Sequence, residues 1–397
     1  MAKTVKARQR PAARRVIVVQ WADMTCFREM LRGISAFANA RLTWQLHFFV
    51  PSDNYLPFIE QQKPDGLVLG LVDREDGLRA TAHARGCVGA VGWSRADGDV
   101  FTSLESDDVR AGELAAQHFI QKGYTEFAYV GNSAAWSFAR AAGFERELEK
   151  AGHSCAQLHQ KWEPPIAGRG WHSTDLTGEL IDWIKALKRP LALLACNDLR
   201  ARIIAQLCRE NGLHIPDEIA ILGVDNDELD CELASPPLSS VAVPWRRIGY
   251  DAAALLDRVL DGEAIEPALT LVPPIGVVER QSTDSVAIAD PEVAASVRFI
   301  RQNAQGQIGV EDILREVPVG RRSLEQRFQA MLQRTPLEEI RRVRIERAKQ
   351  LLATTDLPVR DIGKLSGFGQ STWFSEAFLA LVGESPARYR RRHQRAV

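Results

Sequence analysis

Residues 357–389, LPVRDIGKLSGFGQSTWFSEAFLALVGESPARY, decide the architecture of the C-terminal part of the chain. Apolar residues recur there at near-helical spacing in two runs, which the pair Gly367-Phe368 separates. The first run holds Val359, Ile362, Leu365 and Phe368, and the second holds Phe374, Phe378, Leu379 and Val382. Two short helices joined by a tight glycine-containing turn are typical of a helix-turn-helix, whose second helix enters the major groove of DNA.

A similar pattern lies about fifty residues upstream. It consists of Val310, Ile313 and Leu314, a turn at Pro318-Val319-Gly320, and then Leu324, Phe328, Met331 and Leu332. Between the two patterns, Pro336 to about Thr354 predicts a connecting helix, which spans roughly 27 Å at ~1.5 Å per residue. One turn of DNA measures ~34 Å, so a rigid helix of this length can hold two recognition helices in successive major grooves.

The charge of the chain is unevenly distributed. From residue 297 onward there are 19 Lys and Arg against 11 Asp and Glu, whereas the preceding 296 residues hold 31 basic and 40 acidic residues. A drift of charge along the chain is the simpler alternative, but the basic part coincides with the helix-turn-helix pattern. An acidic body joined to a cationic module suits a protein that neutralises DNA phosphates with its C-terminal part.

Composition narrows the class of protein. A chain of 397 residues, 45% hydrophobic and 25% charged, predicts two or three globular domains. No run approaches the roughly 18 apolar residues of a membrane helix, and the apolar run after the basic N-terminus is too short for a signal peptide. We therefore expect a cytoplasmic location and no membrane partner. The six cysteines have no metal-ligand spacing, and no nucleotide loop or catalytic string is present, so we expect no metal, no cofactor and no enzyme activity.

Residues 16–280 alternate short β-rich runs with amphipathic stretches. The strand candidates are residues 16–20, 44–50, 66–71, 87–93, 127–132, 191–196, 219–224 and 239–243. The helix candidates include residues 27–39, 109–121, 141–150, 176–187, 199–210 and 246–260. This alternation indicates βαβ units around a parallel sheet, in which ligands bind at the carboxyl ends of the strands.

Polar and aromatic residues follow several of these strands. They are Trp21-Ala22-Asp23, Trp93, Asn132-Ser133, Asn197-Asp198 and Asp225-Asn226-Asp227. Carboxylates and amides bond vicinal hydroxyls, and an indole face covers the C–H patches of a sugar ring. Eight of the nine tryptophans precede residue 297, which favours a carbohydrate cleft over a nucleotide site. Individual polar residues at strand ends are also common helix N-caps.

Residues 297–392 resemble the AraC-type DNA-binding domain. The matching positions are Leu324, Arg327, Phe328, Ala348, Leu351, Leu352, Ile362, Gly367, Phe368, Phe374, Phe378, Gly383, Pro386, Tyr389 and Arg390. The preceding body resembles the LacI-type, periplasmic-binding-protein-like sensor, through Asn197-Asp198 after LALLAC, Gly223-Val224-Asp225-Asn226 and Arg140 with Gly143-Phe144. The implied fold class is a two-lobed α/β sensor followed by an all-α domain with two helix-turn-helix units.

The order of these two parts resembles that of the xylose-operon regulators. Val272-Pro273-Pro274, Glu279-Arg280 and Ser282-Thr283-Asp284 also look like that group. The resemblance implies a homodimeric activator of pentose catabolic genes that binds double-stranded DNA, contacts RNA polymerase and responds to an aldopentose, D-xylose above all. By position, the implied sugar contacts fall on Trp21, Asp23, Trp136, Arg140, Trp171, Asp198 and Asp225.

The residues expected to face DNA lie on the second helix of each unit. They are Arg322, Glu325 and Gln326 in the first unit, and Ser371, Thr372, Ser375 and Glu376 in the second. Arg322 and Gln326 suit guanine or adenine edges, and a glutamate accepts from cytosine. The second unit departs from the family pattern because Leu379 and Ala380 replace the usual basic residues. We therefore expect the first unit to contribute more of the DNA affinity.

The expected domains are a basic tail over residues 1–15, a sensor over 16–284, a linker over 285–296 and a DNA-binding domain over 297–397. Two alternatives belong to other classes of protein. One is a sugar-binding receptor module without a direct role in transcription. The other is a carbohydrate-active enzyme with Asp23 and Asp225 as an acid/base pair.

Overall fold

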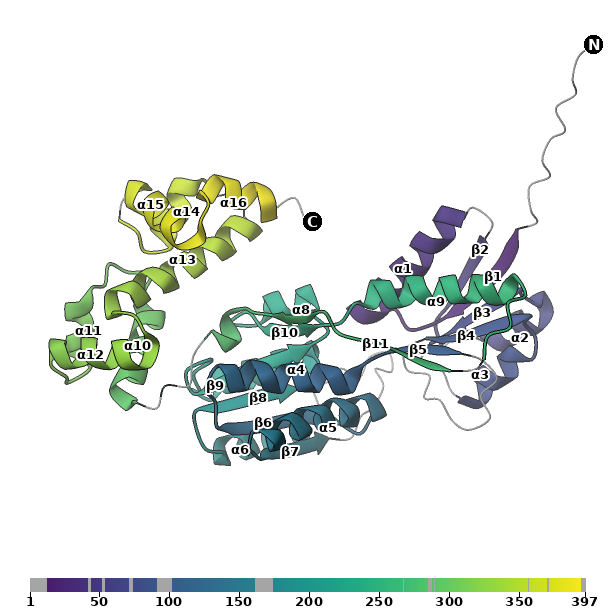
Figure 1. Ribbon diagram of the computed structural model, residues 1–397, viewed down its shortest axis with the longest axis horizontal. Helices are drawn as coiled ribbons and strands as arrows, with labels where there is room; N and C mark the ends of the chain where they lie inside the picture. Colours follow the sequence, from purple (N-terminus) through teal and green to yellow (C-terminus); the bar gives the residue numbers. More distant parts are fainter. Residues whose placement is uncertain are drawn as a thin grey trace, which may run out of the picture. The chain divides into compact units, whose positions relative to one another are not determined.

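The chain divides into an α/β unit, Met1–Asp284, and a helical unit, Ser285–Val397 (Figure 1). The computed structural model describes residues 13–41, 44–51, 54–70, 74–90, 102–160, 174–266, 268–284, 288, 290–355, 357–369 and 371–393. The first unit contains two sheets whose strands are mostly parallel. The described part of the second unit contains only helices. This confirms the predicted fold class.

The first lobe of the α/β unit contains β1 (Arg14–Val19), α1 (Thr25–Arg41), β2 (Trp44–Phe49), α2 (Tyr55–Gln62), β3 (Gly66–Leu69), α3 (Arg74–Thr81), β4 (Gly86–Ala90), β5 (Ser103–Ser106), α9 (Trp245–Leu260) and β11 (Leu269–Val272). Its strands pair in parallel in the order β11-β5-β4-β3-β1-β2. Ile17 and Val19 of β1 pack with Leu67 and Leu69 of β3 in a fully buried cluster. Arg14, which falls in the predicted N-terminal tail, is the first residue of β1.

The second lobe contains α4 (Asp108–Gln121), β6 (Glu126–Asn132), α5 (Ala135–Lys150), β7 (Cys155–Gln160), α6 (Thr174–Ala186), β8 (Leu191–Ala195), α7 (Asp198–Glu210), β9 (Ile219–Val224), α8 (Glu228–Leu233), β10 (Ser239–Ala242), β12 (Gly276–Val278) and the 3₁₀ turn η1 (Gln281–Thr283). The strand order is β12-β10-β9-β8-β6-β7, and β12 alone pairs antiparallel with its neighbour. Every residue of β8 and β9 is buried, as expected for central strands covered on both faces.

The chain passes between the two lobes three times, after β5, after β10 and after β11. The three connections bond to one another through their backbones. The amide of Asp107 donates to the carbonyl of Val272 at 2.9 Å, and the amide of Ile275 donates to the carbonyl of Ala242 at 2.8 Å. A change in the angle between the lobes must therefore be absorbed by these few residues.

Each lobe has a pair of closely packed helices, α1 with α9 and α4 with α5 (Figure 1). Glycines allow the backbones to meet at these crossings. A Cβ at Gly112 would lie 2.0 Å from the carbonyl oxygen of Arg140, and one at Gly143 would lie 1.9 Å from that of Val109. The position of Arg140 therefore depends on the absence of a side chain at Gly112.

The helical unit contains α10 (Pro291–Asn303), α11 (Val310–Glu316), α12 (Arg321–Leu332), α13 (Pro336–Thr354), α14 (Val359–Leu365), α15 (Ser371–Val382) and α16 (Pro386–His393). It has two apolar cores. Ile340 of α13 packs in the first with Leu324 and Phe328, and Ile345 of α13 packs in the second with Phe374 and other buried residues. Helix α13 therefore links the two cores, and its bounds are those predicted from the sequence.

Helices α12 and α15 are equivalent elements of an internal repeat. Each has 12 residues, and each position of α15 lies fifty residues after its counterpart in α12. Both helices end at a left-handed residue, Gln333 with φ 52° and Gly383 with φ 81°, and a proline begins the helix that follows each. This arrangement confirms the two predicted helix-turn-helix units.

Helix α10 begins inside the segment that we expected to be a linker. Asp290 caps it by accepting from the amides of Glu292 and Val293, and Pro291 occupies its first turn. Val293 and Ser296 are fully buried, and Val293 packs in the first core of the helical unit. Residues 291–296 thus pack as part of that unit.

Candidate functional site

A buried arginine organises the carboxyl ends of the second lobe's strands. Arg140 on α5 is only 3% exposed, and its guanidinium donates to Asp108 Oδ1 at 2.8 Å, to the Cys196 carbonyl at 2.5 Å and to Asp225 Oδ1 at 3.1 Å. Its charged end lies over the Trp136 ring, 4.9 Å from the ring centroid. Burial acts to lower the pKa of Arg140, but Asp108 and Asp225 outweigh it and raise the pKa above its ordinary value. Arg140 therefore stays charged and bridges three elements.

Asp225 stands at the end of β9 in an unusual backbone conformation. Its φ is 111° and that of Asn226 is 53°, both in the left-handed range that non-glycine residues rarely adopt. The Asp225 amide donates to the Val241 carbonyl at 2.9 Å, which holds the turn against β10. Burial, with the nearby Asp108 charge, raises the pKa of Asp225 to about 7, although Arg140 opposes the shift. Backbone strain concentrated at one polar turn is typical of a binding site.

Asp198 lies beneath this turn and is 1% exposed. Its Oδ2 accepts from the amide of Asp227 at 2.7 Å, while its Oδ1 has no hydrogen-bond partner among the described residues. A Cβ at Gly223 would lie 2.0 Å from that Oδ1, so only glycine leaves room for the carboxyl group. Burial first, and then the charge of Asp225, raise the pKa of Asp198 well above its usual value. Asp198 thus stabilises the Asp225–Asp227 turn by accepting this hydrogen bond from the amide of Asp227.

The first lobe contributes the segment between β1 and α1. Trp21 is half-buried there and Asp23 is exposed, and the Asp23 carbonyl accepts from Arg28 at 2.7 Å. Cys26, at the start of α1, is buried close enough to Asp225 that, after burial, the charge of Asp225 raises its thiol pKa. The β1–α1 segment therefore faces the turn of Asp225 across the two lobes.

The structure thus brings together Trp136, Arg140, Asp198 and Asp225, and it places the segment of Trp21 and Asp23 on the facing lobe. Trp171, the remaining predicted sugar contact, lies outside the described residues.

The sequence did not single out Asp108, which bonds Arg140 in this group. The only signal was Asp107-Asp108 directly after β5, a four-residue strand, SLES, that is too short and too polar to be recognised.

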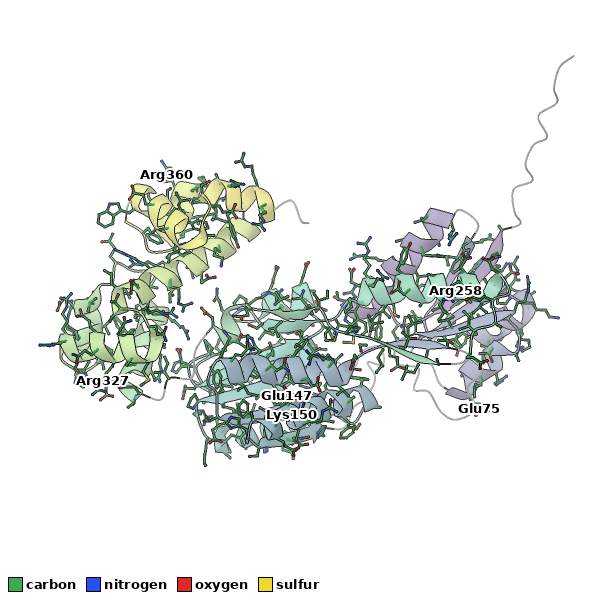
Figure 2. All side chains as sticks on the ribbon, in the orientation of Figure 1. Glu75, Glu147, Lys150, Arg258, Arg327 and Arg360 are labelled. Atoms are coloured by element: carbon green, nitrogen blue, oxygen red, sulfur yellow. The ribbon has the colours of Figure 1, made fainter. Side chains whose placement is uncertain are left out.

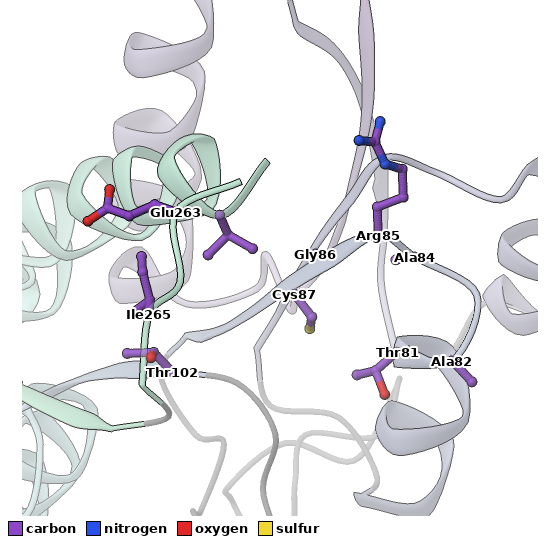
Figure 3. A pocket seen from close by; sticks show the side chains of 10 residues that line it. Thr81, Ala82, Ala84, Arg85, Gly86, Cys87, Thr102, Glu263 and Ile265 are labelled. Carbon is purple, nitrogen blue, oxygen red and sulfur yellow. The ribbon is translucent and has the colours of Figure 1, made fainter. Parts of the chain in front are cut away.

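A hollow lies at the opposite end of the first lobe's sheet, beside the first residue of β4. It measures about 350 Å³, and Figure 3 shows its lining side chains coming from the end of α3, from β4 and from the segment after α9. Its charged side chains are paired within the protein, Arg85 with Asp65 at 3.3 Å and Glu263 with Arg258. Both charged side chains among the described residues that line this hollow are thus already paired within the protein.

The predicted DNA contacts of the first reader lie along α12. Leu324 and Phe328 are fully buried, whereas Arg322 and Gln326 are exposed. Glu325 is half-buried and pairs with Arg321 at 3.2 Å. Arg321 also contacts Glu311 at 2.9 Å. Of the two arginines that begin this helix, Arg322 is thus the one without these acidic partners.

The predicted contacts of the second reader lie along α15. Ser371 and Thr372 are its first two residues, and the side chains of Ser375 and Glu376 are exposed. Phe374 and Phe378 anchor the opposite side of the helix in the second core, where they pack with Phe368 and Tyr389. Figure 2 shows the side chains of the helical unit, with Arg327 near α12 and Arg360 near α14 labelled.

Comparison with known proteins identifies the family. The chain is 32% identical over 291 residues to the xylose operon regulatory protein of Escherichia coli (strain K12), a match that covers 72% of this chain and 73% of that protein. The chain belongs to the family of xylose operon regulatory proteins. The member from Haemophilus influenzae is 29% identical over 371 residues, which cover 91% of this chain and 94% of that protein.

The domain content of this chain agrees with membership of the xylose operon regulator family. A periplasmic binding protein-like domain matches residues 116–283, and a helix-turn-helix domain matches residues 313–392. A solved structure of the xylose-binding transcription activator xylR matches with a TM-score of 0.79 at 26% identity and covers 96% of this chain and 98% of that one. These relatives confirm a DNA-binding transcription regulator and give no support to an enzyme or to a receptor without a role in transcription.

Two further findings concern membranes and metals. Within the described ranges, no helix is both long and apolar enough to cross a bilayer. The same ranges contain no group of three or more His, Cys, Asp or Glu side chains placed to hold a metal ion.

Proposed function

We propose that this xylose operon regulator is a D-xylose-responsive activator of pentose catabolic genes. In this proposal the sensor domain, predicted over residues 16–284, binds the sugar, and the DNA-binding domain, predicted over residues 297–397, binds double-stranded DNA. The predicted linker over residues 285–296 joins them up to the start of α10 at Pro291. The observation that carries the sugar assignment is the group of Trp136, Arg140 and Asp225 at the carboxyl ends of the second lobe's strands, where a fixed cation lies over an indole ring and bonds a carboxylate.

The chemistry of this group suits a neutral polyol. A guanidinium donates to ring and hydroxyl oxygens, a carboxylate accepts from a pair of hydroxyls, and an indole covers C–H groups. Trp21 and Asp23 supply the same residue types from the facing lobe, and Trp171 completes the proposed set. Asp198 acts as a positioning residue, because its carboxylate holds the amide of Asp227. The choice of D-xylose is supported by the names of the relatives.

On the DNA side, we propose Arg322, Glu325 and Gln326 as contacts of the first reader and Ser371, Thr372, Ser375 and Glu376 as contacts of the second. The protein acts as a homodimer in the cytoplasm and contacts RNA polymerase at its promoters. It needs no cofactor. An effector shifts the DNA-competent state only by its differential affinity for two conformations, and the three backbone connections between the lobes are where such a change is absorbed.

A thermal-unfolding screen of the full-length protein tests the sugar assignment. D-xylose, L-arabinose, D-ribose and D-glucose are each added over a concentration series. A ligand that binds only the folded state stabilises it by ~2.7 kcal/mol at one hundred times its Kd. We expect D-xylose to raise the midpoint at the lowest concentration, and we expect Asp225→Asn to abolish the shift. A larger shift with another sugar, or an equal shift in the variant, contradicts the assignment.

A further inference from the structure

We propose that the second reader helix, α15, recognises its part of the operator through Trp373 and Glu376, with a thymine methyl against the indole and a cytosine amino group donating to the carboxylate. Trp373 is thereby a specificity-determining residue that the family resemblance did not single out. The inference rests on the proposed function, because it requires α15 to lie in a major groove.

The internal repeat allows α15 to be compared with α12 position by position. Because the two helices differ by fifty positions throughout, Phe374 corresponds to Leu324, and Phe378 corresponds to Phe328. All four of these side chains are fully buried, so the two helices present equivalent faces outward. The outward residues can therefore be matched in pairs, which are Ser323 with Trp373, Gln326 with Glu376, Gln329 with Leu379 and Ala330 with Ala380.

The matched faces differ in chemistry. Helix α12, RRSLEQRFQAML, carries three arginines and one glutamate, whereas α15, STWFSEAFLALV, carries no lysine or arginine and one glutamate. Arginine and lysine are the residues that read guanine and neutralise phosphates. Helix α15 therefore lacks both means of binding and must read bases in some other way.

The exposed side chains of α15 indicate how this helix could read bases without arginine or lysine. Trp373 is 70% exposed and Leu379 is 53% exposed, although both are large apolar groups. Trp373 and Glu376 are three residues apart, so they are neighbours on the helix surface. The exposed indole of Trp373 and the exposed carboxylate of Glu376 therefore lie side by side in the first turns of α15. In a recognition helix, the N-terminal residues are the ones that contact base edges.

Base chemistry assigns a partner to each group. Among major-groove edges, only thymine presents a methyl group, and apolar side chains read it by contact. An ionised carboxylate is repelled by phosphates, and the base group that suits it is the exocyclic amine of cytosine, to which Glu and Asp bond. Two contacts of this kind give α15 a preference for particular bases but add little affinity. In this proposal α12 and the arginines elsewhere in the unit bind the phosphate backbone of the DNA.

The test uses the full-length protein and duplexes that it selects from a random-sequence library. Each thymine of the selected duplex is then replaced in turn by deoxyuridine, which removes only the methyl group. We expect one or two positions in the part of the site read by the second unit to weaken binding about fourfold, the effect of one buried methyl group at ~0.8 kcal/mol. For Trp373→Ala, the same replacements should have no effect.

Two variants extend the test. Glu376→Gln should lose its preference for cytosine at one position of the selected site and should bind random duplex more tightly, because a negative charge near phosphate is removed. Leu337→Ala is the matched control for Trp373→Ala, because Leu337 is also a large exposed apolar side chain of the same unit, at the start of α13. Its selected sequence should equal that of the wild type.

The outcomes separate this inference from the proposed function. If the wild-type protein selects no sequence, the proposed DNA-binding function fails. If it selects a sequence but Trp373→Ala and Glu376→Gln select the same one, and no deoxyuridine position weakens binding, the inference is overturned, and the exposed face of α15 belongs to a protein contact instead. Thermal unfolding of each variant shows whether the fold is intact, which the 70% exposure of Trp373 leads us to expect.

Discussion

Arg280 donates a hydrogen bond to Oδ1 of Asn226 at 2.8 Å and so joins the turn that carries Asp225 to the last residues of the α/β unit. The 3₁₀ turn η1 begins at the next residue, and its Ser282 and Thr283 are fully buried. Thr283 is also held by His118, at 3.0 Å, within the second lobe. The Arg280 side chain is therefore a direct contact between the Asp225 turn and the last residues of the α/β unit.

Replacing Arg280 with alanine is expected to reduce the effect of D-xylose on DNA affinity more than it reduces D-xylose binding. The side chain links the candidate sugar site to the exit of the unit, but it is not part of the group formed by Trp136, Arg140 and Asp225. Allosteric couplings are typically 1–3 kcal/mol, so a partial loss is measurable. Calorimetry gives the sugar affinity, and fluorescence anisotropy with the selected duplex, with and without D-xylose, gives the coupling.

Arg247→Ala provides the control for Arg280→Ala. Arg247 is an exposed arginine of the same unit, on α9, and it pairs with Asp251 at 2.6 Å. It should leave both sugar affinity and coupling unchanged. A loss of D-xylose affinity in Arg280→Ala as large as that in Asp225→Ala would make Arg280 a part of the binding site.

Replacing Asp225 with alanine is expected to abolish the response to sugar and to leave basal DNA binding intact. The substitution removes the proposed hydroxyl acceptor and also one partner of the buried Arg140. Asp225→Asn is the milder variant, because asparagine tolerates the left-handed backbone at this position. Calorimetry with D-xylose checks both variants, and unchanged affinity in both would remove Asp225 from the site.

The raised pKa of Asp225 predicts how stability depends on pH. An aspartate ordinarily titrates near ~3.9, whereas burial raises the pKa of Asp225 to about 7 in the folded protein. Between these values the folded state binds a proton that the unfolded state releases, so stability falls as pH rises from about 4 to about 7. Without sugar, the wild type should therefore lose stability relative to Asp225→Asn over this range, as measured by denaturant unfolding.

The comparison of the two proteins cancels the contribution of Glu105, whose pKa burial also raises and which is present in both. It reports Asp225 together with its effect on Asp198, because the charge of Asp225 is one cause of the raised pKa of Asp198. A constant difference between about pH 4 and about pH 7 would mean that the pKa of Asp225 is not raised in the folded protein. Affinity for D-xylose should rise as pH increases through about 7, because an ionised carboxylate accepts hydrogen bonds more strongly than a neutral one.

Much of the architecture was predictable because periodicity is strong where packing is strong. The runs at residues 219–224 and 336–354 became β9 and α13 with the expected bounds, since one is buried at every position and the other begins with a capping box between Thr335 and Glu338. Strands β5, β7, β11 and β12 were missed. Each is short or at a sheet edge, where few apolar residues are required.

The candidate site was predictable as a set of strand-end residues but not as a network. That Asp225 follows β9 is visible in the sequence, whereas the bonds of Arg140 to Asp108 and Cys196 depend on how α4 and α5 pack. The burial of Asp198 was likewise not visible, because its carboxyl group is accommodated by the missing side chain of Gly223. Contacts between elements distant in sequence are the part that periodicity does not encode.

Replacing Gly112 with alanine is expected to destabilise the protein and to weaken sugar binding together. The new Cβ would lie 2.0 Å from the Arg140 carbonyl oxygen and 2.6 Å from the Phe144 amide, so α5 must move away from α4 and take Arg140 with it. Overpacking of this kind costs about 1–3 kcal/mol. Denaturant unfolding and D-xylose calorimetry measure the two effects.

The control for Gly112→Ala is Gly178→Ala on α6, where the added Cβ meets nothing within 4 Å. Alanine is the better helix former by about 1 kcal/mol, so this variant should be more stable than the wild type and bind D-xylose normally. If Gly112→Ala were as stable as Gly178→Ala, the close contact between α4 and α5 would not control the position of Arg140.

Replacing Arg322 with alanine is expected to weaken binding to the selected duplex by about 1–3 kcal/mol and to relax the preference at one base pair, because an exposed arginine on a recognition helix reads guanine by paired hydrogen bonds. Arg321→Ala is the comparison, since Arg321 is already engaged by Glu311 and Glu325 and should contribute less. Anisotropy titrations on the selected and on a random duplex, each at several salt concentrations, distinguish the roles. An equal loss on both duplexes, with a salt dependence reduced by about one ion, would make Arg322 a phosphate contact and would move the search for the base-reading residue of the first unit to Gln326.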